Sequence, residues 1–326
     1  MTCNHAWKGR NRQTKIDGMN QAAFAGAPRP TQSLVVPALL ACYVIWGSTY
    51  LAIRVALEGF PPFFQMGTRF LAAGALLMAW SLRPGVWRAG KAPRLPTARE
   101  WRNALVIGAL MLGGGMGLTA SAELHIGSGL IAAFVAVTPM FICGWGLLFG
   151  QRPNRFELAG MGVGLVGVLL LVRGAGFSGS PVGIACIAGA TITWSFGSVL
   201  STTRLPIAPG PIGFASEMLC GGAVLMLVSL AMGEQFSWPV RPAALAAWLY
   251  LVIFGSLIAF SAYMYLLANA TPAMATSYAF VNPLIALFLG VAAASEAVTG
   301  AEWGACSVVL AGVLLIFRGK TVQLRE

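Results

Sequence analysis

Charged residues are scarce in this sequence: only 10% of its 326 residues are charged, whereas 57% are hydrophobic. A water-soluble domain carries about 25% charged residues, so this chain has too little polar surface to stay in water at this length. Its long apolar stretches must therefore face lipid. The composition indicates an integral membrane protein.

Residues for metal binding and catalysis are also few. The sequence has two His and six Cys residues, and the cysteines show no paired spacing, so neither a disulfide framework nor a metal site is indicated. It has no H-E-x-x-H, G-x-S-x-G or Walker motif, and without a Walker loop the chain cannot itself use ATP for pumping. A G-x-G-x-x-G pattern starts at Gly162, but it lies inside an apolar stretch with no preceding strand, so no cofactor is predicted.

Runs of about 17–25 apolar residues are long enough to cross a bilayer as helices, and the sequence contains ten of them. The stretch from Pro242 to Ser295 has no charge and is too long for one span, so we place a break at Asn269–Pro272, because Asn and Pro favour turns. The predicted fold is an all-α integral membrane protein with ten transmembrane helices, at 34–53, 63–82, 103–122, 126–149, 157–173, 181–202, 212–232, 243–266, 273–294 and 301–317.

The charge distribution predicts the orientation in the membrane. Residues 1–32 form a basic tail without the hydrophobic core and cleavage site of a signal peptide. The sequence does not decide whether translation starts at Met1 or at Met19. With this tail in the cytoplasm, most of the 21 Lys and Arg residues are cytoplasmic, and the opposite side has only Arg54, Arg173 and Arg241. The positive-inside rule then makes both termini cytoplasmic, including the tail at 320–326. The net charge of +11 therefore reflects topology and attraction to anionic lipid, not binding to nucleic acid.

An internal repeat divides the chain. When Met66–Met78 is aligned with Phe214–Met226, Gly74 falls on Gly222, and Arg69 falls on Glu217. Later segments match as well, so we predict two copies of one five-span unit at 34–174 and 181–319. Five is odd, so the second copy is inverted relative to the first. Inverted repeats are typical of secondary transporters, whose substrate site lies near the midplane between the halves.

Arg69 and Glu217 are the only charges well inside any predicted span. Ionisable residues there usually face a cavity or a partner, which makes Glu217 a candidate proton carrier. Two questions stay open on sequence grounds. The first is whether each side chain instead lies near its helix end and extends to the lipid headgroups. The second is whether Arg69 and Glu217 form an ion pair, which the repeat does not decide.

These features together resemble the EamA family of the drug/metabolite transporter superfamily. The resemblance rests on the duplicated five-span unit, on an Arg early in the second span, and on IWGSTYLAIRVALEGFPPFFQMGTRFLAAG from Ile45. It implies a ten-helix basket around a central cavity. It also implies movement of amino acids, other metabolites or amphiphilic toxicants across the inner membrane, mostly outward. One departure is that the family pattern has a Glu after the fourth and ninth spans, whereas here Glu296 matches it and Arg152 does not.

The candidate substrate residues are aromatic and weakly polar side chains on several spans. Trp46 and Trp194 occupy equivalent positions deep in the first and sixth spans, too deep for an interfacial aromatic belt. Pro139 and Pro283 interrupt the fourth and ninth spans at matched points, which favours hinges or cavity lining over simple packing kinks. The predicted substrate-binding set is Trp46, Ser48, Tyr50, Trp194, Ser198, Tyr263, Tyr278 and Asn282.

The leading interpretation is a secondary transporter, most consistent with an exporter of amphiphilic or zwitterionic small molecules. An intramembrane enzyme acting on lipid-linked substrates is the alternative, but it would have only Arg69 and Glu217 for its chemistry. The sequence does not distinguish proton coupling from facilitated diffusion, or a monomer from a homodimer.

Overall fold

The computed structural model describes residues 34–83, 94–126, 131, 134–173, 180–294 and 299–323. The contacts divide the chain into two units, Met1–Leu34 and Val35–Glu326, and every helix named below belongs to the second. The described residues form helices and no strand, which confirms the all-helical prediction. The elements are α2 (Val35–Leu57), α3 (Pro62–Ser81), α4 (Ala98–Gly108), η2 (Ala109–Gly117), α5 (Leu118–Ala122), α7 (Thr138–Leu148), α8 (Arg155–Val172), α9 (Pro181–Thr203), α10 (Pro211–Ala231), α11 (Pro242–Tyr250), η3 (Leu251–Phe260), α12 (Ser261–Asn269), α13 (Pro272–Thr276), α14 (Tyr278–Ala294) and α15 (Gly300–Gln323).

Each of the ten predicted segments contains helix. Among the described residues, five helical stretches are long and apolar enough to cross a membrane, and shorter apolar helices cover Phe134–Leu148 and Trp303–Gly319. Those five stretches are Val35–Leu57, Ala98–Ala122, Pro181–Thr203, Pro211–Ala231 and Pro242–Asn269. The helix break between α12 and α13 falls at Ala270–Thr271, inside the predicted Asn269–Pro272 break.

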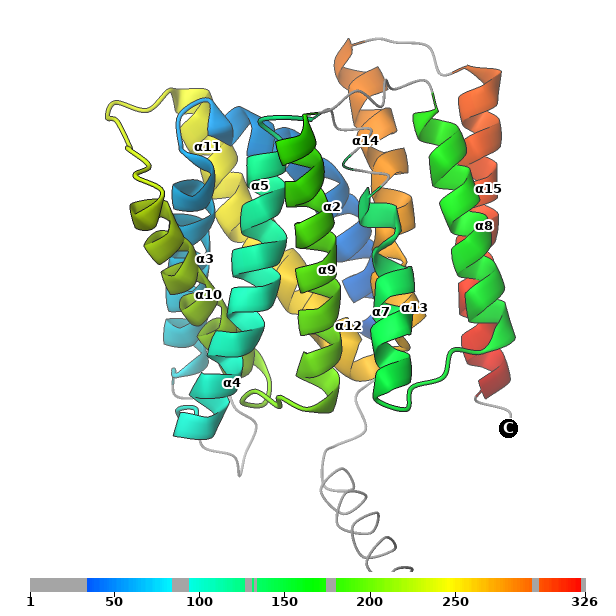
Figure 1. Ribbon diagram of the computed structural model, residues 1–326, viewed down its shortest axis with the longest axis horizontal. Helices are drawn as coiled ribbons and strands as arrows, with labels where there is room; N and C mark the ends of the chain where they lie inside the picture. Colours follow the sequence, from blue (N-terminus) through cyan, green and yellow to red (C-terminus); the bar gives the residue numbers. More distant parts are fainter. Residues whose placement is uncertain are drawn as a thin grey trace, which may run out of the picture. The chain divides into compact units, whose positions relative to one another are not determined.

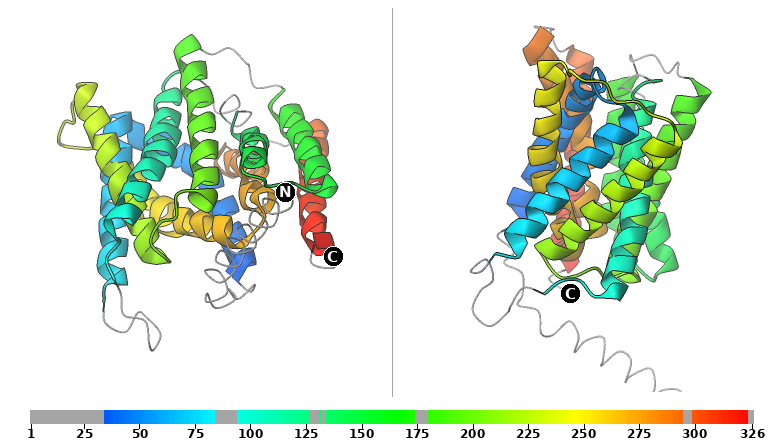
Figure 2. Two further views of the ribbon diagram at one scale, coloured as in Figure 1. Left: turned by 60° about the horizontal axis from the view of Figure 1, so that its bottom comes forward. Right: turned by 90° about the vertical axis from the view of Figure 1, so that its left-hand side faces the viewer.

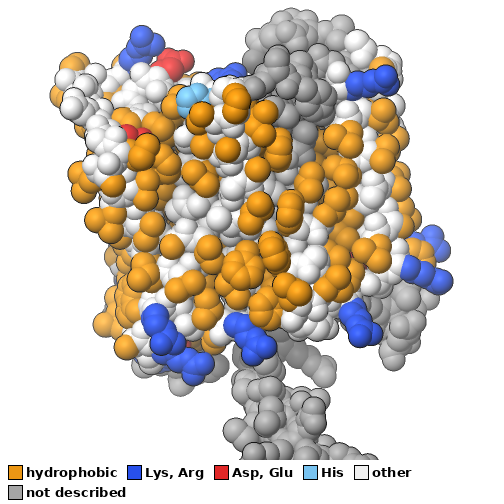
Figure 3. Space-filling view, in the orientation of Figure 1, with side chains coloured by type: hydrophobic (Ala, Val, Ile, Leu, Met, Phe, Trp, Pro, Cys, Tyr) orange, Lys and Arg blue, Asp and Glu red, His pale blue; other side chains and the backbone are white. Residues whose placement is uncertain are grey.

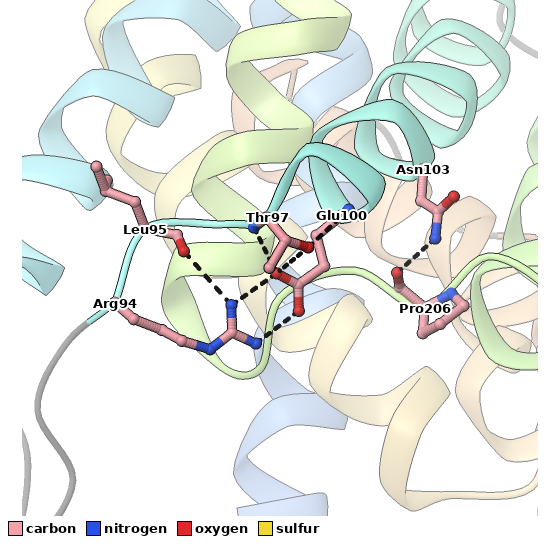
Figure 4. Close-up of polar contacts among 6 residues, drawn as sticks. All are labelled: Arg94, Leu95, Thr97, Glu100, Asn103 and Pro206. Atoms are coloured by element: carbon pink, nitrogen blue, oxygen red, sulfur yellow. Dashed lines mark hydrogen bonds and ion pairs between the residues drawn. The ribbon is translucent and has the colours of Figure 1, made fainter.

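Proline and capping residues set where the helices begin. The helices α3, α9, α10, α11 and α13 each have Pro in the first turn, where its missing N–H removes no helical hydrogen bond. Capping boxes start α4, with Thr97 and Glu100, and α8, with Asn154 and Glu157. Figure 4 shows the first box, in which Arg94 also pairs with the Glu100 carboxylate at 2.7 Å.

The third and eighth predicted spans both contain a wide, π-helical segment. Residues Ala109–Gly117 form η2 between α4 and α5, and Leu251–Phe260 form η3 between α11 and α12. A π-helical turn changes the direction of side chains and leaves backbone carbonyls available to neighbours, and such turns are common at functional sites. The same device therefore occurs in both halves of the chain.

The two helix pairs with the most extensive contacts both join the halves. The helix α3 packs along α10, and α8 packs along α15 (Figures 1 and 2). Close approach of α8 and α15 requires glycine, because a Cβ atom at Gly160 would lie 2.6 Å from the carbonyl oxygen of Gly312. Asn103 adds a contact between the halves by donating to the carbonyl oxygen of Pro206 at 2.8 Å (Figure 4).

The surface of the helix bundle is apolar, unlike that of a soluble protein, while several polar side chains are buried. Large apolar side chains such as Leu148, Leu230 and Leu314 are exposed, and Figure 3 shows hydrophobic side chains covering the face between two edges that carry the charged ones. Arg69, Gln65 and Glu217 are fully buried instead. Lipid contact explains this arrangement, since lipid accepts apolar surface and polar groups gather inside a helix bundle.

The start of α3 is held from the other half by Glu234, in the loop between α10 and α11. Its carboxylate accepts hydrogen bonds from the amides of Phe63, at 3.1 Å, and Phe64, at 2.8 Å. These amides belong to the first turn of α3 and have no partner within the helix. A carboxylate at a helix N-terminus is also favoured by the helix dipole.

We expect Glu234→Ala to destabilise the protein, because both amides lose their acceptor. The loss should be about 1–2 kcal/mol, measured as a lower midpoint of thermal unfolding of the purified protein in detergent. Glu58→Ala is the matched control. It breaks the ion pair with Arg241, which also joins the two halves but is exposed, and exposed pairs contribute little. Equal midpoints for the two variants would contradict the capping role.

Candidate functional site

A central cavity of about 60 Å³ lies where helices of both halves meet. The first half contributes α2, η2, α5 and the first turn of α7, and the second half contributes α9 and α14. The lining residues are Trp46, Thr49, Tyr50, Ile53, Gly115, Met116, Thr119, Val135, Thr138, Ile187, Ala190, Thr191, Trp194, Tyr278 and Asn282. The cavity is therefore mainly apolar and aromatic, with hydroxyl groups and one amide.

Three aromatic rings, those of Trp46, Trp194 and Tyr278, form one wall of this site, and Tyr263 packs behind them. Trp46 lies at the centre, with ring centroids 5.6 Å from Trp194, 5.1 Å from Tyr263 and 4.6 Å from Tyr278. Trp194 and Tyr263 stack at 5.3 Å. Edge-to-face and offset contacts at these distances are favourable and rigid. Trp46 and Trp194 are thus in contact, although they lie 148 residues apart in the sequence (194 − 46 = 148).

Several polar atoms in the cavity wall have no protein partner. The indole N–H of Trp194 is buried and makes no hydrogen bond, and neither does either amide atom of Asn282. The indole of Trp46 instead donates to the carbonyl oxygen of Gly255 at 3.3 Å. Buried polar atoms are normally paired, and here the two donor groups and one acceptor lack a bond of good geometry, although the hydroxyls of Tyr263 and Tyr278 lie near the Trp194 indole and that of Tyr50 lies near the Asn282 amide.

The other predicted substrate residues lie outside the lining. Tyr263 and Ser198 are buried behind the aromatic wall, where their hydroxyl oxygens are 2.9 Å apart. Ser48 is turned away from the cavity, and its hydroxyl contacts that of Tyr250 at 2.6 Å. Ser48 does not share the face of Trp46, because residues two apart on a helix point in different directions.

The threonines of the lining were missed as substrate candidates. Thr49 and Thr191 lie one helical turn from Trp46 and Trp194, respectively, so the spacing of three residues was a usable signal. Thr119 gave no such signal, because its position depends on the π-helical turns of η2 that precede it.

Pro139 and Pro283 occupy different settings. The helix α7 begins at Thr138, so Pro139 lies in its first turn, where it borders a second cavity rather than the central one. Pro283 lies inside α14, next to Asn282. The region of Glu296 is outside the described residues, so the structure says nothing of that part of the family pattern.

Arg69 is fully buried one layer behind the central cavity. Its Nε donates to the hydroxyl of Ser256 in η3 at 2.7 Å, its Nη1 contacts the sulfur of Met66 at 3.5 Å, and its guanidinium lies 4.8 Å from the centre of the Phe70 ring. Full burial leaves no support for the alternative in which this side chain extends to the headgroups. Arg69 binds η3 at Ser256, next to Gly255, whose carbonyl oxygen accepts from Trp46. It therefore supports the aromatic wall from behind.

Glu217 is also fully buried, on the face of α10 within the bundle. Neither carboxylate oxygen has a hydrogen-bond partner. It makes no ion pair with Arg69, and the ion pairs of the described residues are Arg94–Glu100 and Arg241–Glu58. The structure therefore places the two intramembrane charges apart, and Glu217 does not line the central cavity.

The lining of the central cavity is suited to binding a small molecule. No cluster of three or more His, Cys, Asp or Glu residues that would hold a metal occurs in the part of the chain that the structure describes. The cavity has aromatic faces, hydroxyl groups and an amide, which suit a small molecule with an apolar part and a polar part.

Comparison with known proteins adds independent information. The model of the EamA-like transporter family matches residues 33–173 and again residues 181–318. The inner membrane transporter YedA of Escherichia coli strain K12, itself described as uncharacterized, is 41% identical over 284 residues, covering 87% of this chain and 90% of that protein. A probable terminal-alkyne amino-acid exporter of Streptantibioticus cattleyicolor is 26% identical over 302 residues, covering 90% of this chain and 97% of that protein.

A solved crystal structure is similar in fold. It shares 24% sequence identity with this chain and matches it with a TM-score of 0.70, covering 87% of this chain and 96% of the other. At this identity the likeness concerns the fold alone.

Proposed function

Because the chain belongs to the EamA-like transporter family, we propose that it is a secondary exporter of small amphiphilic or zwitterionic molecules, with amino acids and related metabolites as the leading class. Family membership sets aside the intramembrane enzyme, since the family and the relatives are named as transporters. We propose alternating access around the central cavity as the mechanism and the inner membrane as the location.

One observation carries the proposed substrate class: the central cavity combines an aromatic wall with unpaired polar atoms of Trp194 and Asn282. Aromatic faces bind the apolar part of a solute, and the unpaired donors and acceptor bind its polar part. The name of the Streptantibioticus relative, an amino-acid exporter, supports the same class.

We further propose ten membrane spans arranged as two inverted five-helix repeats. Three features support this arrangement. The family model matches the chain twice, in segments close to 34–174 and 181–319. The helix of the second predicted span (α3) packs along that of the seventh (α10), and the helix of the fifth (α8) packs along that of the tenth (α15). The third and eighth predicted spans both contain a π-helical segment. Repeats of this kind commonly rock against each other around a fixed site.

Transport into everted membrane vesicles tests the function directly. Vesicles that contain the protein should accumulate at least one labelled solute from a panel of amino acids and cationic dyes, compared with vesicles from cells without it. Accumulation should continue when ATP is absent and an ion gradient is supplied by respiration. Equal accumulation with and without the protein over the whole panel would contradict the proposed substrate classes.

The proposed orientation places residues 83–102 in the cytoplasm. We expect a membrane-impermeant maleimide to label Trp238→Cys but not Leu95→Cys in intact cells, because the two exposed positions lie in loops on opposite sides. Both should be labelled after the membrane is opened. Labelling of Leu95→Cys from outside would overturn the orientation.

Glu217 is the proposed proton carrier. A carboxyl group without a partner in an apolar interior is best kept neutral, so its charge changes only when water or a partner reaches it. We expect Glu217→Gln to transport with a flattened dependence on pH, since Gln keeps the shape and cannot titrate. An unchanged pH profile of the transport rate would remove Glu217 from this role.

A further inference from the structure

Among the described residues, capping boxes start α4 and α8, and the glutamates of these two boxes make different hydrogen bonds. At α4, both oxygens of Glu100 are used: Oε2 accepts from the Thr97 amide, and Arg94 contacts both oxygens at 2.7 Å (Figure 4). At α8, Oε2 of Glu157 accepts from the Asn154 amide at 3.0 Å, but Oε1 has no partner. Capping alone needs only one oxygen, so the second oxygen of Glu157 requires an explanation.

The free oxygen of Glu157 belongs to a side chain that lines a second cavity. This cavity has a volume of about 240 Å³ and lies between α7, the loop at 149–154, α8 and the start of α13. Glu157 is only 3% exposed. Arg152, which is exposed, also lines the cavity and makes no ion pair among the described residues. A buried carboxylate and an exposed guanidinium thus share one space.

The rest of the lining combines the polar side chains of Gln151 and Thr271 with apolar residues, among them Pro139, Ile142, Met161, Pro272 and Ala273. A carboxylate in such surroundings is stabilised by a cation that donates a hydrogen bond, as Arg94 does for Glu100. None of the lining residues other than Arg152 is cationic, and the cavity has room for a small group. The missing partner of Glu157 is therefore expected to come with a ligand.

We propose that this second cavity binds the ammonium group of a small zwitterionic or cationic solute, with Glu157 Oε1 as its acceptor and Arg152 as the partner of a carboxylate on the same solute. In this proposal, which rests on the proposed transport function, the second cavity is the place where the charged head of the substrate is first bound. The sequence departure at Arg152 then has a role, because the Glu of the family pattern would repel that carboxylate.

The position of the second cavity fits a loading site. Thr138 lines the central cavity, and the next residue, Pro139, lines the second one. On the opposite wall, α13 borders the second cavity, and Tyr278 and Asn282 of α14 border the central one. The first turn of α7 and the α13–α14 segment therefore each border both spaces. A change at these two helix starts would connect them.

Cys143 provides a test that does not depend on knowing the transported solute, because it lines the second cavity and no cysteine lines the central one. We would prepare the full-length protein with Cys143 as its only cysteine and measure its rate of reaction with 2-aminoethyl and 2-hydroxyethyl methanethiosulfonate. The two reagents differ in charge and hydrogen bonding but are nearly equal in size. Their rate ratio cancels any effect of a substitution on the thiol itself.

We expect the ammonium reagent to be favoured and Glu157→Gln to lower the rate ratio by about tenfold, given the attraction between unit charges in a partly buried site. Gln still accepts the Asn154 amide, so the helix cap is kept. Glu100→Gln, the same change in the other capping box, should leave the ratio unchanged. The proposal is overturned if Glu157→Gln keeps the ratio, or if Cys143 reacts with neither reagent.

The same variants separate this inference from the proposed function. If vesicles transport a solute of the panel but the rate ratio is insensitive to Glu157→Gln, the exporter stands and the loading site fails. If the ratio falls as expected but no solute is transported, the ammonium site stands and the proposed function fails. For a transported amino acid, Glu157→Gln should raise KM several-fold, because it removes the acceptor for the ammonium group.

Discussion

Arg69→Lys is expected to lose most transport activity while the protein still inserts into the membrane. Lys offers a compact ammonium on a flexible stem, whereas Arg69 uses a planar group that donates from Nε to Ser256 and lies against the ring of Phe70. A hydrogen bond from a charged donor is worth about 1.5–3 kcal/mol. Its loss corresponds to about tenfold or more in an equilibrium between conformations.

The fit around Arg69 is tight as well as polar. A Cβ atom at Gly255 would lie 2.8 Å from Nη2 of Arg69 and 3.3 Å from a methyl carbon of Thr49. Thr49 lines the central cavity, and the carbonyl oxygen of Gly255 accepts from Trp46. A displaced side chain at residue 69 would therefore disturb η3 and the aromatic wall together. Gly255→Ala should lower transport for the same reason.

The measurement is the initial rate of transport in everted vesicles, normalised to the amount of protein in the membrane. Arg54→Lys is the matched control, because Arg54 lies exposed in the last turn of α2, and the change should have almost no effect there. Full activity of Arg69→Lys would mean that any cation at this position is sufficient, and the positioning role of the guanidinium would be abandoned.

Replacement of either central tryptophan by Ala is expected to have an effect at least as large. Trp46 and Trp194 are only 6% and 7% exposed and touch each other. Loss of either ring removes contact surface for an apolar solute, and it removes a ring neighbour of Tyr263 and Tyr278 in the case of Trp46 and of Tyr263 in the case of Trp194. Removing a buried Trp side chain costs about 3–5 kcal/mol of packing, so transport should fall below detection and the apparent stability should decrease.

Phe replacements separate recognition from packing. Trp194→Phe keeps a six-membered aromatic ring and removes the pyrrole ring with its N–H, so we expect a raised KM with a smaller loss of maximal rate than in Trp194→Ala. Trp46→Phe removes the bond to the Gly255 carbonyl oxygen and should lower the maximal rate instead. Trp80→Ala, at an exposed position of α3, is the control. If both Ala variants transport normally, the rings serve packing alone, and the substrate site lies elsewhere.

The sequence alone determined the helical class and the positions of the helical segments, and it carries the proposal of two equivalent halves. These properties follow from local composition, because apolar length, Pro and capping residues decide where a helix starts and ends in lipid. The duplicated pattern was also sufficient to single out Trp46 and Trp194, since equivalent positions in two repeats remain visible without coordinates. Arg69 and Glu217 were equally conspicuous, as charges in apolar runs.

Only the tertiary structure decided how these residues are used. Whether Ser48 faces the cavity depends on the rotation of α2 against its neighbours, and its hydroxyl is taken by Tyr250. Whether Arg69 meets Glu217 depends on the distance between helices, and Ser256 in η3 is its partner instead. The free oxygen of Glu157 was invisible in the sequence, because capping boxes at Glu100 and Glu157 read alike. Burial and the presence of a neighbouring cation are non-local properties, and they distinguish a satisfied carboxylate from one that awaits a ligand.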